Sequence, residues 1–105
     1  MKNVLSFLLA AIVLLPVSCA RKDTVKVMSF NIRYGKANDG ENSWDNRKTA
    51  VIAMLDAVKP DIVGMQEVLP FQQDYVVEKC PRFKAYGIGR NDGVEGERMT
   101  VIYNT

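Results

Sequence analysis

The pattern of apolar positions after residue 24 predicts four strands. In VKVMSFNIRY, residues 25–34, apolar side chains occupy both alternating sets of positions, which is typical of a strand covered on both faces. DIVGMQEV, residues 61–68, is a second such run. FKAYGIGR and RMTVIYNT, residues 83–90 and 98–105, predict two further strands, joined by the glycine-rich and acidic loop NDGVEGE.

Two helices are predicted between these strands. Asn42 or Ser43 can cap the first, and Pro60 stops it. Pro70 suits the first turn of the second helix, which ends before Pro81. The first helix is expected to bury one stripe, formed by Ala50, Val51, Met54, Leu55 and Val58.

Polar side chains stand at the ends of the first two strands. The order strand, helix, strand predicts two neighbouring parallel strands, whose carboxyl ends lie at one edge of the sheet. Asn31 and Glu67 would then face the same rim. A carboxylate and an amide oxygen are ligands that a hard ion such as Mg²⁺ prefers. The alternative is that Glu67 ends a strand in solvent and Asn31 caps a turn.

The first twenty residues, MKNVLSFLLAAIVLLPVSCA, predict a signal peptide. Lys2 precedes an apolar run over residues 8–15, and small residues follow. The end of this segment resembles a bacterial lipobox, in which Cys19 would be lipidated; the alternative is ordinary cleavage after Ala20. We expect an exported protein of the bacterial cell envelope, either periplasmic or anchored to the membrane through its lipid.

Composition limits the remaining choices. The 105 residues, 48% hydrophobic and 25% charged, are enough for one small domain or part of a larger one. A net charge of +2 gives no strong attraction to nucleic acid, so a phosphate-bearing substrate would need a local site. The sequence contains no histidine that could activate Cys80, which we expect to be a buried, unpaired thiol.

Four segments together resemble a known family. MSFNIRY, WDNRK, PDIVGMQEV and GIGRNDGVEGE followed by VIY are similar, in order and spacing, to the N-terminal half of the endonuclease/exonuclease/phosphatase superfamily. The resemblance covers residues 25–103. It implies an α/β fold, the N-terminal half of a four-layer α/β sandwich with two packed mixed β-sheets flanked by helices. Residues 24–105 are then expected to be a partial domain, truncated at the C-terminus.

The resemblance also implies a metal-dependent phosphoester hydrolase that uses Mg²⁺ or Mn²⁺. Glu67 matches a metal-binding glutamate, and Asn31 matches an asparagine beside the metal and the scissile phosphate. Glu97 matches a glutamate that orients a catalytic histidine, and Arg90 falls where some members contact phosphate. Arg47 matches an arginine that looks structural. The substrate stays open between sugar phosphate, nucleic acid and phospholipid, and no protein partner is predicted.

The chain lacks parts that the resemblance requires. It has no histidine and no GDFN-like strand end, so we expect an N-terminal fragment that is inactive alone. An apolar sheet face should be exposed where a second sheet would pack. The alternative function is a non-catalytic envelope lipoprotein that uses the same fold for binding.

Overall fold

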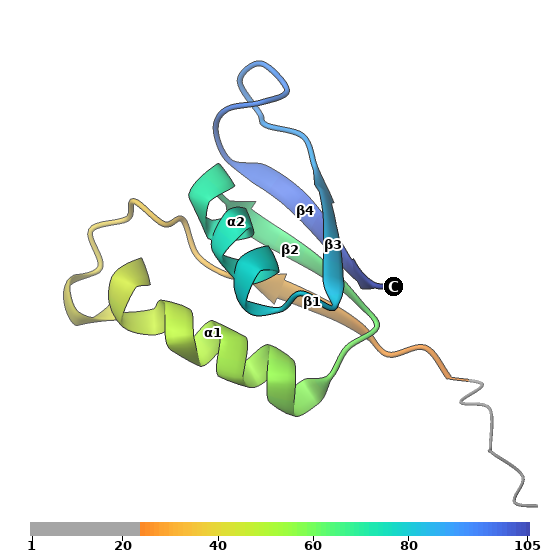
Figure 1. Ribbon diagram of the computed structural model, residues 1–105. Helices are drawn as coiled ribbons and strands as arrows, with labels where there is room; N and C mark the ends of the chain where they lie inside the picture. The colour runs from red at the N-terminus through yellow and green to blue at the C-terminus, as the bar shows by residue number, and fades with distance from the viewer. Residues whose placement is uncertain (1–23) are drawn as a thin grey trace, which may run out of the picture.

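A four-stranded mixed sheet with two helices on one face makes up the part of the chain that the structure, a computed structural model, describes, residues 24–105 (Figure 1). The predicted α/β class is confirmed. The signal peptide over residues 1–20 and the lipidation of Cys19 lie outside the described residues. The elements in chain order are β1 (Val27–Asn31), the 3₁₀ helix η1 (Gly40–Asn42), α1 (Trp44–Val58), β2 (Ile62–Val68), α2 (Pro70–Lys79), β3 (Phe83–Gly87) and β4 (Arg98–Asn104).

The strand order is β1-β2-β4-β3. β1 and β2 pair in parallel, as predicted, and their register places Asn31 opposite Gln66. β4 is antiparallel to both β2 and β3. The carboxyl ends of β1 and β2 therefore meet at one edge of the sheet. The loop that joins β3 to β4 extends beyond the same edge (Figure 1).

Helix α1 begins and ends where the sequence predicts. Ser43 is its N-cap residue, and Lys59 ends it in the left-handed conformation, with φ 52°, donating its N–H to the Leu55 carbonyl at 2.9 Å. The predicted stripe is wrong at Ala50, which is exposed. Successive helical residues are rotated by about 100°, so Ala50 points away from the face that buries Val51. The buried side chains of α1 are Trp44, Val51 and Leu55.

The hydrophobic core lies between the helices and the sheet. Val63, Met65 and Ile102 project from the strands into it and are fully buried. Cys80 is also fully buried and is a free thiol, as predicted. Burial raises the pKa of the Cys80 thiol, which keeps it protonated and unreactive. Within residues 24–105, no helix combines the length and apolar character needed to cross a membrane.

The opposite face of the sheet carries exposed apolar side chains. Val27 is 69% exposed, so the prediction that β1 is covered on both faces is wrong within the described residues. Alternate residues of a strand point to opposite faces of the sheet. Both helices cover the face opposite to that of Val27 (Figure 1). The exposed apolar face that the sequence predicts is confirmed. Its members are Val27, Ile62, Tyr86, Met99, Val101 and Tyr103.

Candidate functional site

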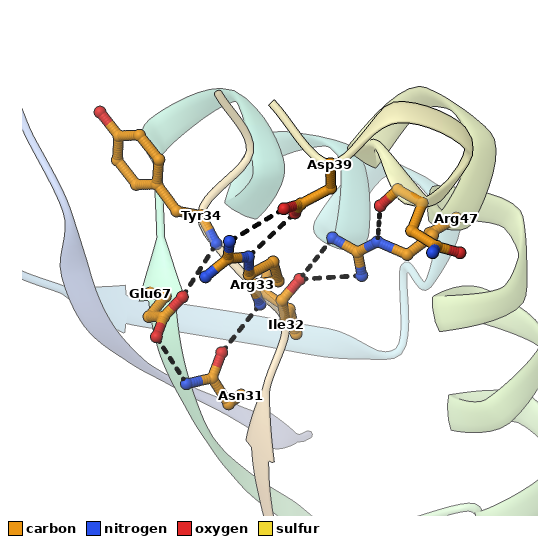
Figure 2. A network of polar contacts seen from close by, with 8 residues as sticks. Asn31, Ile32, Arg33, Tyr34, Asp39, Arg47 and Glu67 are labelled. Atoms are coloured by element: carbon orange, nitrogen blue, oxygen red, sulfur yellow. Dashed lines mark hydrogen bonds and ion pairs between the residues drawn. The ribbon is translucent and has the colours of Figure 1, made fainter. Parts of the chain in front are cut away.

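The two polar strand ends meet at the rim of the sheet. Asn31, the last residue of β1, donates a hydrogen bond from Nδ2 to Oε1 of Glu67 in β2 at 3.0 Å, although 36 residues separate them in sequence (Figure 2). Asn31 does cap a turn, as the alternative expects, because its Oδ1 accepts the Arg33 N–H at 2.9 Å. Glu67, however, accepts hydrogen bonds from Asn31 and Tyr34 and does not simply end a strand in solvent. Parallel pairing of β1 and β2 places both residues at one edge.

A β-bulge turns Glu67 out of the core. Met65 is fully buried, and in a regular strand the residue two positions later would point to the same face. The register of β2 with β4 shifts between Met65 and Val68, and Glu67 adopts φ 60°. Val68 consequently fills the core, and the Glu67 carboxylate stands half-buried at the rim. A positive φ in a residue other than glycine is costly, and such strain is concentrated at functional sites.

The surroundings of Glu67 keep it ionised. The hydrogen bond from Asn31 lowers the pKa of the Glu67 carboxyl most, and the backbone N–H of Tyr34, which donates to Oε2 at 3.1 Å, lowers it further. The charge of Arg33 acts in the same direction. A carboxylate fixed by two donors is held ready, in charge and orientation, for a cation.

The loop after β1 is closed by an arginine that sequence reasoning missed. Arg33, with φ 65°, donates its N–H to Oδ1 of Asn31 at 2.9 Å. Its guanidinium donates to both carboxylate oxygens of Asp39, each at 2.9 Å (Figure 2). This pairing lowers the pKa of Asp39 and raises that of Arg33, and the hydrogen bond between the two side chains is the largest cause of both shifts. The only sequence signal was an arginine after a strand end with an acidic residue in the following loop.

Gln72 anchors this loop to α2 and was also missed. It is fully buried, and its Nε2 donates to the Arg33 carbonyl at 2.9 Å. Its Oε1 accepts the N–H groups of Gly35 at 3.0 Å and Leu69 at 2.9 Å. Leu69 is the N-cap residue of α2, so one side chain satisfies both the helix start and the loop. A glutamine two residues after Pro70, which marks the expected first turn of the helix, was the available signal.

Arg47 supports the other side of the same loop. Its Nη1 and Nη2 donate to the Ile32 carbonyl at 3.2 and 3.1 Å, and its Nε donates to the Asn42 carbonyl at 2.6 Å (Figure 2). The guanidinium also lies 6.0 Å from the Trp44 ring centroid. These contacts are all internal to the protein, and they agree with the structural role expected for Arg47.

Arg90 and Glu97 lie on the loop between β3 and β4. The Arg90 N–H donates to the Glu97 carbonyl at 3.0 Å, and both residues line a small pocket together with Tyr34. Tyr34 lies between the two halves of the predicted site, because its N–H donates to Glu67 and the residue also lines the pocket of Arg90 and Glu97. The structure thus brings Asn31 and Glu67 into direct contact. Arg90 and Glu97 lie together at a separate pocket, which Tyr34 also lines, and they line a further pocket with Tyr86, Met99 and Val101 of the apolar sheet face.

The residues at the rim fit a hard divalent cation in charge and donor type. Glu67 offers an ionised carboxylate, and such ions accept one or two carboxylates together with water and phosphate oxygens. Asn31 turns its amide nitrogen to Glu67 and its oxygen to the Arg33 N–H, which orients the carboxylate. Among residues 24–105 there is no group of three histidine, cysteine or acidic side chains that could hold a metal by itself. Direct ligation by Asn31 stays a prediction.

The mixed sheet with this polar rim defines an α/β protein whose candidate chemistry lies at the carboxyl ends of parallel strands. The chain belongs to the endonuclease/exonuclease/phosphatase family, whose model matches residues 28–99. No protein among the curated sequences matches it significantly.

Solved structures share the fold over most of the described residues. An endonuclease/exonuclease/phosphatase from Bacteroides vulgatus is 38% identical, with a TM-score of 0.74 over 77% of this chain and 31% of its own. A family protein from Bacteroides thetaiotaomicron is 30% identical, with a TM-score of 0.72, and the match covers 77% of this chain and 30% of that protein. A mannosyl-6-phosphatase from Bacteroides thetaiotaomicron is 29% identical, with a TM-score of 0.73, and the match covers 78% of this chain and 32% of that protein. The chain thus spans about a third of the length of these structures.

Removing the Asn31 amide is expected to raise the pKa of Glu67. In Asn31→Ala the largest cause of the lowered pKa is lost, while the Tyr34 N–H remains. A carboxyl group whose pKa is depressed by folding stabilises the folded protein at pH values above its ordinary pKa. This stabilisation is lost as the pH falls through the depressed pKa. The acid limb of stability should therefore move to higher pH. Carboxyl ¹³C NMR titration measures the pKa, with Asn46→Ala as control; an unchanged Glu67 titration would contradict the expectation.

Proposed function

We propose that this protein is an exported, metal-dependent phosphoester hydrolase. The hydrogen-bonded pair of Asn31 and Glu67 at the rim of the sheet carries the proposal, because it supplies an oriented, ionised carboxylate in a chain of this family. Glu67 would hold Mg²⁺ or Mn²⁺. When bound, such an ion polarises a phosphoryl oxygen and offsets the charge that develops on the leaving oxygen.

The protein's own residues bind and orient the substrate in this proposal. Asn31 and the Tyr34 N–H hold the Glu67 carboxylate in one orientation, which avoids reorganisation during the reaction. The Arg90 guanidinium contacts a phosphate oxygen through charge-assisted hydrogen bonds. Glu97 lines the same pocket and would orient the catalytic histidine that the family resemblance implies, which is not among residues 1–105. The match of Arg90 and Glu97 to family positions in the loop supports these two roles.

Localisation is proposed from the leader sequence. The apolar segment behind Lys2 and the cysteine at its end support export to the bacterial envelope, with lipidation of Cys19 as the anchor. Mass spectrometry of the membrane fraction would detect the acylated cysteine. Release of the protein with a free N-terminus after Ala20 would favour ordinary cleavage instead.

The proposed activity is tested on full-length protein with a chromogenic phosphomonoester and a chromogenic phosphodiester. We expect hydrolysis of at least one of them with Mg²⁺ or Mn²⁺, because the site supplies the carboxylate that such an ion needs. Addition of EDTA should abolish the activity, and excess metal should restore it. Absence of hydrolysis with either ion, in protein shown to be folded by circular dichroism, would favour the non-catalytic lipoprotein.

A further inference from the structure

A second pocket adjoins the rim site. It lies between the loop after β1, the first turn of α2 and the end of the loop between β3 and β4. The small pocket of Arg90 and Glu97 shares Tyr34, Asn91 and Gly96 with it, so the two form a continuous surface. The Tyr34 ring extends away from Asn31 and Glu67 (Figure 2). A group attached to a phosphate at the rim would therefore reach this second pocket. Its principal side chains are Tyr34, Lys36, Phe71, Asp74, Asn91 and Glu95.

These side chains combine aromatic surface with groups that bind hydroxyls. Tyr34 is 37% exposed and Phe71 is 43% exposed, which leaves apolar surface available to a ligand. Asp74 and Glu95 are exposed carboxylates that accept hydrogen bonds, and Asn91 both donates and accepts. None of the ion pairs within residues 24–105 involves Asp74 or Glu95. The pocket therefore offers an apolar wall and free polar groups side by side.

The charges of the pocket select against a polyanion. Asp74 and Glu95 contribute two negative charges, and Lys36 contributes one positive charge. A nucleic-acid strand carries a further phosphate at each nucleotide, and that phosphate would face these carboxylates without the broad basic surface on which such binding depends. An uncharged group with several hydroxyls meets no such repulsion. Its hydroxyls can donate to the carboxylates, and its C–H face can lie on an aromatic ring.

Local bonds fix the pocket before a ligand arrives. Asp92 Oδ1 accepts the N–H groups of Val94 at 2.8 Å and Glu95 at 2.6 Å, and the Asn91 N–H donates to the Glu95 carbonyl at 3.2 Å. Gly96 has φ 87°, and a Cβ there would lie 2.8 Å from Asn91. On the other wall, Gln72 holds the backbone of Gly35. A preformed pocket binds its ligand without the cost of ordering these loops.

We propose that this second pocket holds the polyhydroxylated part of a sugar phosphate substrate, with Phe71 and Tyr34 against the sugar ring and Asp74, Asn91 and Glu95 on its hydroxyls. The proposal rests on the proposed phosphoester site, which it deepens by naming the substrate class. The similar structure named a mannosyl-6-phosphatase is in accord with it.

Calorimetry on the full-length protein in the presence of EDTA, which should suppress hydrolysis, tests this pocket independently of turnover. Mannose 6-phosphate is titrated into wild type, Asp74→Ala and Phe71→Ala, with Glu78→Gln on the exposed side of α2 as control. We expect each pocket variant to weaken binding at least about 10-fold, from loss of a charged hydrogen-bond acceptor or of an aromatic contact. The control should bind as wild type does. Wild-type protein that does not bind mannose 6-phosphate, or pocket variants that bind it equally well, would overturn the proposal.

Hydrolysis of two phosphomonoesters separates this proposal from the one on which it rests. The ratio of kcat/KM for mannose 6-phosphate to that for phenyl phosphate should fall at least about 10-fold in Asp74→Ala, because phenyl phosphate has no hydroxyls for the carboxylate to bind. A ratio that stays constant while metal-dependent hydrolysis persists would overturn the sugar pocket and leave the hydrolase intact. Preference for a single-stranded oligonucleotide over mannose 6-phosphate would also overturn the pocket proposal.

Discussion

Replacing Glu67 by glutamine is expected to lower kcat/KM for phosphoester hydrolysis by on the order of 10²–10³-fold, the loss typical of a preorganised charge-stabilising group. Glutamine keeps the size of the side chain but removes the negative charge that two donors hold at the rim. Affinity for Mg²⁺ and Mn²⁺ should fall in parallel, because a neutral amide is a weaker ligand than a carboxylate. Steady-state kinetics and metal titration by calorimetry on full-length protein measure the two effects separately.

Glu41→Gln is the matched control for this experiment. Glu41 is an exposed glutamate in the 3₁₀ helix η1, so its substitution makes the same chemical change away from the rim. Its activity and metal affinity should equal those of wild type. If Glu67→Gln kept full activity and full metal affinity, the rim pair would not be the metal site. Loss of metal affinity would identify the site even for a substrate that is turned over slowly.

Replacing Gln72 by leucine is expected to destabilise the protein by about 3 kcal/mol. Three backbone groups, on Arg33, Gly35 and Leu69, lose a hydrogen bond, and an unsatisfied buried polar group costs roughly 1–3 kcal/mol. Gln72 is fully buried, so water does not readily replace it. Urea unfolding of the full-length protein, followed by circular dichroism, measures the change in the free energy of unfolding.

Glu78→Leu on the same helix is the control for Gln72→Leu. Glu78 is exposed, and its ion pair with Lys79 at 3.4 Å contributes little in solvent. Its free energy of unfolding should stay within about 0.5 kcal/mol of wild type. A Gln72→Leu variant as stable as this control would show that the loop after β1 does not depend on Gln72. Because that loop carries the Tyr34 N–H, we also expect weaker metal binding in Gln72→Leu.

Local sequence signals predicted most of the elements. Ser43 and the Lys59-Pro60 pair marked the ends of α1, and Pro70 marked the start of α2, because caps and prolines act on the backbone nearby. The strands were predicted longer than they are: β1 ends at Asn31 and β3 at Gly87. Apolar residues beyond these ends, such as Ile32, enter the core from a loop, which periodicity does not distinguish from a strand.

The side-chain network of the rim could not be predicted in this way. Gln72 and Arg33 are 39 residues apart, and their bond depends on how α2 packs against the loop after β1. The outward turn of Glu67 depends on a bulge in the pairing of β2 with β4, a strand that comes 30 residues later in the chain. Hydrogen bonds of such long sequence separation follow from the packing of elements, and no local pattern encodes them.

The sequence by itself determined the α/β class, the parallel pairing of the first two strands and the location of an amide and an acid at their ends. These features depend on periodicity, capping and the connection of neighbouring elements, all of which act over short stretches of chain. Only the tertiary structure decided that Asn31 bonds to Glu67, that Tyr34 links the rim to the loop between β3 and β4, and which side chains form the open sheet face. Those outcomes depend on register, a bulge and the side on which the helices pack, which are properties of the assembled sheet.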